Sequence, residues 1–242
     1  MSHRVEHLAD GVTLYLGDCR DVLPTLGKVD AVLTDPVWPN APKAHAWEKF
    51  GWSDLAGRDQ PQQTLADMFA ALMELPKRAV IVVRNDSDPR FFAAVPSALP
   101  FFRAQILSYV LPSYIGRKLG GEELAYGFGE AIKPFNNGAS LMPGRSAPAQ
   151  PVKANGHPCS RSQEHFDWLM HWWSHSGETI LDPFMGSGTT GVAAVKLGRR
   201  FIGIEIEPKY FDIACRRIGE AIKQTDLFIN IPPPAKHEVL PL

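Results

Sequence analysis

Apolar residues occur in two patterns that take turns along the chain. One is typical of buried strands, and the other is typical of amphipathic helices. Short β-branched apolar runs predict strands over residues 12–18, 29–35, 79–86, 179–184 and 200–208. Apolar positions three and four residues apart predict helices over residues 63–76, 163–175 and 209–224, with a glycine-rich turn and helix over 185–198. A strand followed by a crossover helix is the unit of a parallel sheet covered on both faces, so the pattern predicts an α/β fold.

The middle and the end of the chain interrupt this pattern. Prolines and glycines recur between residues 96 and 156 and predict a loop-rich region, in which residues 112–155 are the candidate recognition insertion. The prolines of the last residues exclude a helix or a central strand and predict a surface extension. We therefore assign residues 1–111 and 156–228 to two parts of one domain. Residues 112–155 are the candidate insertion between them, and residues 229–242 are a proline-rich tail.

Composition narrows the class of protein. A length of 242 residues with 45% apolar and 21% charged residues fits one globular domain with a modest insertion. The net charge of −1 excludes a polycation that coats nucleic acid by charge alone. Residues 77–161 nevertheless hold eleven Lys and Arg against five Asp and Glu, which predicts either a local polyanion-binding surface or an ordinary solvated face. Three distant cysteines suit a reducing compartment, and no apolar run suits a signal peptide or a membrane span, so we expect a cytoplasmic protein.

A glycine-rich turn lies between the predicted strand 179–184 and the helix that follows it. Residues 186–191, Gly-Ser-Gly-Thr-Thr-Gly, match the G-x-G-x-x-G pattern, and Glu205 ends the next strand. Glycines let a backbone approach a ligand closely, a helix N-terminus offers unpaired N–H groups, and an acidic side chain can bind ribose hydroxyls. The turn therefore predicts a nucleoside cofactor, with an ordinary tight turn as the alternative.

The place of this turn in the sequence predicts the order of the sheet. Nucleotide-binding sheets usually begin with such a strand, yet here only one further strand and one helix follow it. Two strands are too few for a doubly wound sheet, so the remaining strands must come from the N-terminal half. We therefore predict a circularly permuted sheet whose cofactor site lies beyond the carboxyl ends of strands 179–184 and 30–34, next to Asp35.

Residues 34–39, Thr-Asp-Pro-Val-Trp-Pro, place a carboxylate, a proline-fixed carbonyl and an aromatic ring at a strand's carboxyl end. Together with residues 182–191, Asp-Pro-Phe-Met-Gly-Ser-Gly-Thr-Thr-Gly, this motif resembles the amino-methylating DNA methyltransferases of the permuted β class. These enzymes transfer a methyl group from S-adenosylmethionine to adenine N6 or cytosine N4. The resemblance covers residues 12–38 and 156–220, and it implies a Rossmann-like methyltransferase fold with a mostly parallel sheet of about seven strands.

The resemblance also implies roles for individual residues. It makes Asp35, Pro36 and Trp38 catalytic, with Val37 and Pro39 beside the substrate. The cofactor-binding residues that it implies are Asp18, Cys19, His157, Cys159, Arg161, Asp182, Pro183, Phe184, Gly186, Ser187, Gly188, Thr189 and Glu205. The sequence departs from the family pattern in two places: Val37 replaces a second proline, and Arg161-Ser162 replaces Lys-Pro. We expect Arg161 to pair with the carboxylate of the cofactor's methionine part.

The implied function is site-specific methylation of adenine N6 in double-stranded DNA, since an aspartate at position 35 resembles the adenine-specific members. Cytosine N4 is the alternative target. A base in a duplex must flip out to reach such a site, and Trp38 is the candidate stacking platform. Family members often dimerise and serve restriction-modification systems, but the sequence carries no firm sign of a homodimer or of an endonuclease.

Three other functions compete with this one. A zinc site among His157, Cys159, His165, His171 and His175 overlaps the segment assigned to the cofactor and lacks a C-x-x-C pair, so we expect no metal. A nicotinamide-dependent oxidoreductase explains the glycine turn and Glu205 but not residues 34–39. A non-catalytic DNA-binding relative is the third alternative, because Val37 leaves the catalytic loop less rigid.

Overall fold

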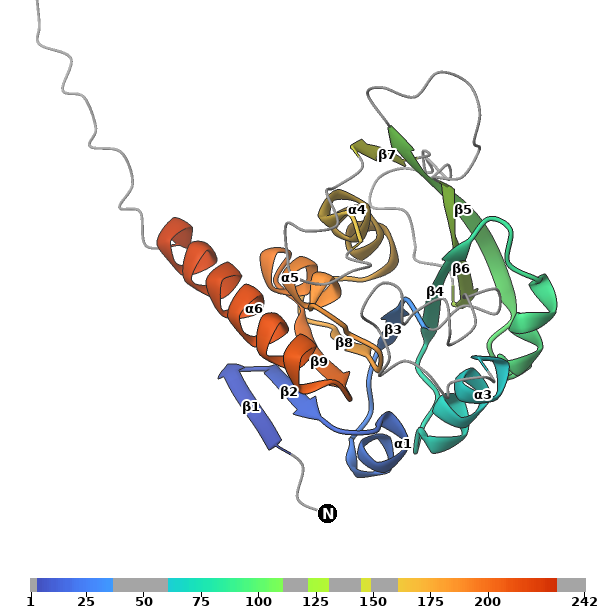
Figure 1. Cartoon of the computed structure of the whole chain (residues 1–242), viewed down its shortest axis with the longest axis horizontal. Coiled ribbons are helices and arrows are strands. Elements are labelled where there is room, and N and C mark those ends of the chain that lie inside the picture. The colour runs from blue at the N-terminus through green and yellow to red at the C-terminus, as the bar shows by residue number, and fades with distance from the viewer. Residues whose placement is uncertain (1–3, 37–60, 111–121, 131–144, 149–160, 230–242) are drawn as a thin grey trace, which may run out of the picture.

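The computed structural model describes residues 4–36, 61–110, 122–130, 145–148 and 161–229. Within these residues nine strands form one sheet in the order β1-β2-β9-β8-β3-β4-β6-β5-β7 (Figure 1). The strands are β1 (Arg4–Ala9), β2 (Val12–Leu16), β3 (Ala31–Thr34), β4 (Arg78–Arg84), β5 (Phe101–Val110), β6 (Glu122–Gly129), β7 (Arg145–Pro148), β8 (Thr179–Asp182) and β9 (Arg200–Glu205). The α-helices are α1 (Cys19–Val22), α3 (Pro61–Ala71), α4 (Gln163–Trp173), α5 (Thr189–Lys196) and α6 (Pro208–Ile229), with 3-10 turns η1 (Leu23–Thr25) and η3 (Pro89–Ala94).

The centre of the sheet is parallel and draws on both halves of the chain. Neighbouring strands run parallel from β2 through β9, β8 and β3 to β4. Strands β8 and β9, from the C-terminal part of the sequence, thus lie between β2 and β3, from the N-terminal part. This order confirms that the N-terminal half completes the sheet, while the circular permutation relative to other nucleotide-binding proteins stays a prediction.

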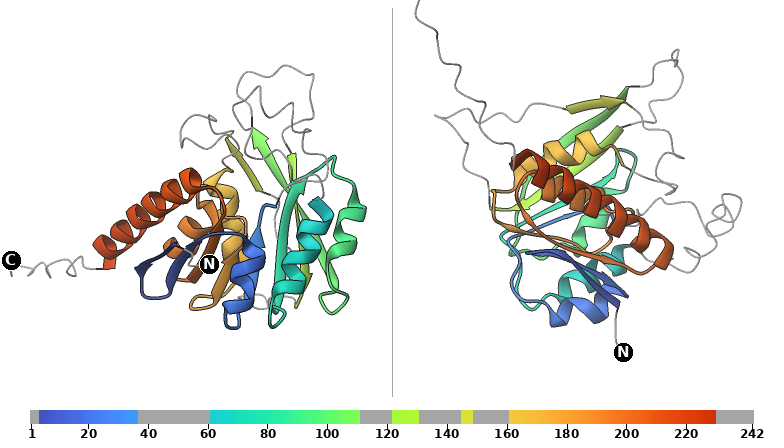
Figure 2. Two further views of the ribbon diagram at one scale, coloured as in Figure 1. Left: turned by 60° about the horizontal axis from the view of Figure 1, so that its bottom comes forward. Right: turned by 90° about the vertical axis from the view of Figure 1, so that its left-hand side faces the viewer.

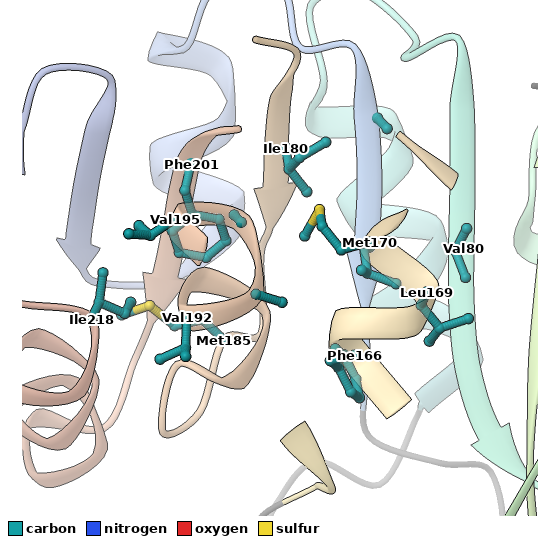
Figure 3. Packing of buried hydrophobic residues seen from close by; sticks show 14 of the residues in the cluster. Val80, Phe166, Leu169, Met170, Ile180, Met185, Val192, Val195, Phe201 and Ile218 are labelled. Atoms are coloured by element: carbon teal, nitrogen blue, oxygen red, sulfur yellow. The ribbon is translucent and has the colours of Figure 1, made fainter. Parts of the chain in front are cut away.

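Helices cover the two faces of the sheet, and each face has its own apolar cluster. Along β4 the buried side chains alternate, because successive residues of a strand point to opposite faces. Val80 and Val82 belong to the cluster under α4, α5 and α6, whereas Ile81 and Val83 belong to the cluster under α1, α3 and η3. Figure 2 shows the helices on both sides of the sheet, and Figure 3 shows Val80 facing residues of α4 such as Leu169. The continuous apolar runs of the central strands follow from burial on both faces.

The strands and helices predicted from the sequence are found. Several of their boundaries differ, and the sheet contains four further strands that were not predicted. The prediction of a loop-rich region is wrong for residues 101–110 and 122–129, which form β5 and β6. Strand β6 pairs antiparallel with both β4 and β5, so part of the candidate insertion 112–155 is an integral part of the sheet. With β1 and β7 also unpredicted, the sheet has nine strands rather than about seven. The last helix continues beyond residue 224 to Ile229, and the helix after the glycine turn begins at Thr189.

Candidate active site

Acidic side chains follow four neighbouring parallel strands, at the point where each strand ends. They are Asp18 after β2, Glu205 at the end of β9, Asp182 at the end of β8 and Asp35 after β3. The carboxyl ends of parallel strands meet at one edge of a sheet, which is where open α/β sheets bind ligands. The two segments that the sequence singled out therefore lie at one edge of the molecule.

A hydrogen bond joins these two segments directly. The hydroxyl of Thr34 donates to Oδ1 of Asp182 over 2.8 Å, between residues 148 positions apart. The pairing of Ala31 with Ile180 and of Val32 with Leu181 fixes the same register in the backbone. The prediction that the two motifs meet at adjacent strand ends is confirmed.

Asp182 is fully buried and holds the start of the glycine turn. Its other oxygen, Oδ2, accepts a 2.5 Å hydrogen bond from the hydroxyl of Thr190, and Oδ1 also accepts one from the backbone N–H of Phe184 at 3.1 Å. Burial raises the pKa of Asp182 to about 7, the nearby charge of Asp35 adds to the rise, and the three hydrogen bonds act against it. Near neutral pH this carboxyl group is therefore close to its titration point.

The glycine turn has the backbone geometry that its sequence predicts. Gly186 and Gly188 have φ angles of +52° and +81°, and Gly188 is the N-cap of α5. A Cβ atom at Gly188 would lie 3.0 Å from the side chains of Ala214 and Ile218 on α6, so both the left-handed backbone and the close helix packing require glycine there. The turn brings the N-terminus of α5 to the edge where the four acidic residues lie.

Glu205 supports this turn from the neighbouring strand. Its carboxylate accepts hydrogen bonds from the backbone N–H of Gly186 at 2.9 Å and of Glu207 at 2.8 Å. These two bonds tie the carboxylate to the start of the glycine turn and to the backbone that follows β9. Directly after the neighbouring strand β2, the N–H of Gly17 donates to the carbonyl of Glu205. Asp18 then caps α1 by accepting from the N–H of Arg20. The predicted residues Glu205 and Asp18 therefore lie at adjacent strand ends.

A second support of the turn, which was not expected from the sequence, is centred on Arg217 of α6. Its Nη1 donates to the carbonyl of Ser187 at 2.6 Å and to the hydroxyl of the same residue at 2.9 Å. Its Nη2 donates to Oε1 of Gln163, the first residue of α4, and Gln163 in turn donates to the carbonyl of Thr189. The start of α4 is thus tied to the glycine turn. No sequence signal marks Arg217, because its role depends on how α6 crosses the turn.

Arg161 connects Asp35 to Glu123, which was not expected at the site from the sequence. Its Nε donates to Oδ2 of Asp35 at 2.5 Å and its Nη2 to Oδ1 at 3.3 Å, while Nη1 lies 2.8 Å from Oε1 of Glu123 on β6. The side chains of Arg161, Asp35 and Glu123 are 17%, 19% and 6% exposed. Because β6 runs antiparallel to β4, its first residues lie at the same edge as the carboxyl ends of the parallel strands. Glu123 is therefore a fifth acidic residue at this edge.

Several predicted site residues fall outside the described part of the chain, namely Val37, Trp38, Pro39, His157 and Cys159. Of the others, Pro36, Cys19, Pro183, Ser187 and Thr189 are buried, and Phe184 is partly buried. Within the described residues, no cluster of three or more His, Cys, Asp and Glu side chains has a geometry that could hold a metal ion. The same part of the chain contains no helix that is both long and apolar enough to cross a bilayer.

Comparison with known proteins agrees with the motifs. Residues 132–216 match the family described as DNA methylase, a range that includes Arg161, the glycine turn and Glu205. The chain is 45% identical over 73 residues to the type II methyltransferase M2.DpnII of Streptococcus pneumoniae, a match that covers 30% of this chain and 27% of that protein. The chain thus spans about a quarter of the length of this curated relative.

Solved structures resemble the chain over most of its length. The complex of M1.HpyAVI with SAM superposes with a TM-score of 0.61 at 24% identity, over 85% of this chain and 98% of that one. The PvuII DNA methyltransferase, described as cytosine-N4-specific, superposes with a TM-score of 0.58 at 17% identity, over 90% and 92%. These likenesses show the α/β fold of S-adenosylmethionine-dependent DNA methyltransferases.

Proposed function

We propose that this protein transfers a methyl group from S-adenosylmethionine to the N6 amino group of adenine in double-stranded DNA. The observation that carries the proposal is the direct hydrogen bond between Thr34 and Asp182, which brings the Asp35 motif and the glycine turn to adjacent strand ends. The likeness to DNA methyltransferases over residues 132–216, and in overall fold, supports the same activity.

The residues at the strand ends fit S-adenosylmethionine. Glu205, at the end of β9, would accept hydrogen bonds from the ribose hydroxyls, and Asp18 would lie beside the adenine. The left-handed Gly186 and Gly188 let the backbone approach the ligand. When bound, the cofactor supplies a methyl group on a positively charged sulfur. The acidic character of this edge is complementary to that charge.

Asp35 and Pro36 would handle the target amine. An exocyclic amine is a poor nucleophile because its lone pair is delocalised into the ring, so the site must accept its N–H groups and orient it. The carboxylate of Asp35 and the carbonyl of Pro36 are acceptors of this kind. Positive charge develops on the amine nitrogen during transfer, and the carboxylate stabilises that charge electrostatically. No covalent intermediate with the protein is needed.

Access to the base requires that it leave the DNA duplex. We propose that the base flips out and that Trp38 stacks on it, with the Lys and Arg residues between 77 and 161 contacting phosphates. Adenine is the proposed target because position 35 is an aspartate. Cytosine N4 remains the alternative outcome of the experiment below, and a homodimer and a role in restriction-modification are further proposals that this experiment does not address.

The test is transfer of a tritiated methyl group from S-adenosylmethionine to unmethylated double-stranded DNA, followed by nucleoside analysis. We expect labelled N6-methyladenine, and we expect Asp35→Ala to reduce turnover at least 100-fold while the cofactor still binds. Asp212→Ala removes an exposed carboxylate of α6 and serves as the control, with turnover unchanged. Full turnover by Asp35→Ala contradicts the catalytic role, and labelled N4-methylcytosine contradicts the adenine assignment.

A further inference from the structure

We propose that Arg161 is a positioning residue that holds the carboxylate of Asp35 in place, with Glu123 as the fixed anchor on the other side of the guanidinium. This inference rests on the proposed function and deepens it. It assigns to Arg161 a task at the methyl acceptor, in place of the contact with the cofactor's carboxylate that the sequence suggested, and it gives Glu123 a role.

The contacts of Arg161 constrain Asp35 in two directions. Nε and Nη2 donate to the two different carboxylate oxygens of Asp35, at 2.5 Å and 3.3 Å. A guanidinium that bonds both oxygens fixes the plane of the carboxylate as well as its position, because the N–H groups of the fork are rigid and coplanar. The target amine would donate to this oriented carboxylate.

Glu123 provides the rigid end of this arrangement. It lies on β6 opposite Arg84 of β4 and Leu107 of β5, and its side chain is only 6% exposed. Its contact with Nη1 of Arg161 at 2.8 Å occupies the side of the guanidinium away from Nε. The guanidinium thus donates two hydrogen bonds to Asp35 and forms an ion pair with Glu123. The position of Asp35 is in this way fixed relative to β6, an interior strand of the sheet.

Charge gives a second reason for the arrangement. Asp35 and Glu123 are two acidic groups on one guanidinium, and the charge of Asp35 also acts on the buried Asp182. Asp35 is partly exposed, whereas Glu123 and Asp182 are buried. Without Arg161, electrostatic repulsion would therefore move the Asp35 side chain away from Glu123 and Asp182. A displacement of about 1 Å at a reacting group costs on the order of 100-fold in rate.

The start of α4, two residues after Arg161, connects the contacts of Arg161 to the glycine turn. Gln163 donates to the carbonyl of Thr189 and accepts from Arg217, which also holds Ser187. The backbone at the start of α4 is therefore fixed relative to the turn. Arg161 projects from this fixed point to Asp35, so the acceptor site and the glycine turn share one support.

The test compares Arg161→Lys and Glu123→Gln with the control Arg4→Lys. Arg4 also bridges two carboxylates, Glu6 and Asp212, but at the β1 edge of the sheet. Lysine keeps the charge of Arg161 and loses the fork. We expect Arg161→Lys to reduce kcat for DNA methylation at least 10-fold and Glu123→Gln to reduce it about 3- to 10-fold. The dissociation constant of S-adenosylmethionine, measured by calorimetry, should change less than 2-fold in both, and Arg4→Lys should behave as the unmodified protein.

Other outcomes separate the inference from the proposed function. If Arg161→Lys loses cofactor affinity 10-fold or more while kcat is unchanged, Arg161 is a cofactor ligand and the proposal is overturned. A wild-type kcat in both Arg161→Lys and Glu123→Gln also overturns it. If the unmodified protein methylates no DNA, the proposed function fails. The contact is then tested by melting temperatures of Asp35→Asn, Arg161→Lys and the double variant. Non-additive shifts support the positioning contact, and additive shifts overturn it.

Discussion

At the scale of single residues, the most informative group is Asp182, because it joins the two motifs and carries an altered pKa. Its pKa of about 7 in the folded chain lies above the ordinary value of 3.8, chiefly because of burial. The folded state therefore holds this proton more tightly than the unfolded state does. The contribution to stability is fully present below about pH 4 and is lost as the pH rises through about 7.

We accordingly expect the free energy of unfolding to fall between about pH 4 and pH 7, by an amount on the order of a few kcal/mol at about 1.4 kcal/mol per pKa unit. Asp182→Asn removes the titrating group and should flatten this dependence, as measured by urea unfolding at several pH values. Asp88→Asn is the matched control, because the pKa of Asp88 is held at about 2 by hydrogen bonds with Arg90, outside this range. An unchanged pH dependence in Asp182→Asn contradicts the assignment.

The acidic residues of the site differ in how far the sequence predicts their position. Asp35, Asp182 and Glu205 were predictable because each follows a strongly apolar run, and parallel strands bring their carboxyl ends together. Glu123 was not predictable in the same way. It is one of two adjacent glutamates at the start of a strand that the sequence did not reveal, and only the pairing of β6 with β4 brings it to the site.

At the scale of elements, the central parallel strands were predictable and the strands beyond β4 were not. Burial on both faces makes strands such as β4 continuously apolar, and this pattern is visible in one sequence. Strand β5 lies near the end of the sheet, where Phe101 and Ile106 remain exposed, so its apolar residues follow no clean period. The sequence of β6 contains two glycines, which usually weaken a strand.

Gly127 of β6 shows why a glycine is tolerated in this sheet. A Cβ atom there would lie 1.9 Å from the indole ring of Trp173 on α4, so the ring packs directly against the strand backbone. We expect Gly127→Ala to destabilise the fold by about 1–3 kcal/mol through overpacking, which lowers the melting temperature by several degrees. Gly219→Ala on α6 is the control, since a Cβ at that position meets no atom within 4 Å. Equal melting temperatures for the two variants would contradict the close packing.

At the scale of the whole molecule, the sheet takes strands from both halves of the chain, and the candidate site depends on both. The Asp35 motif and the glycine turn belong to different halves, joined through β3 and β8. A ligand that binds the turn and the neighbouring strand ends should therefore stabilise the sheet as a unit. A ligand that binds only the folded state stabilises it by about 2.7 kcal/mol at 100 times its dissociation constant.

The acidic strand ends predict which of two cofactors the protein binds. S-adenosylmethionine at saturating concentration should raise the melting temperature by several degrees, whereas NAD should not. The reason is that Asp18, Glu205 and Asp35 make the edge acidic. The positively charged sulfur of S-adenosylmethionine is complementary to this charge, and the diphosphate of NAD is not. Asp35→Ala should retain most of the effect, since Asp35 is proposed to bind the target amine. A shift with NAD alone would favour the oxidoreductase. Hydrogen exchange measured in parallel should show slower exchange in β8 and β9 and, because β3 pairs with β8, in β3 as well.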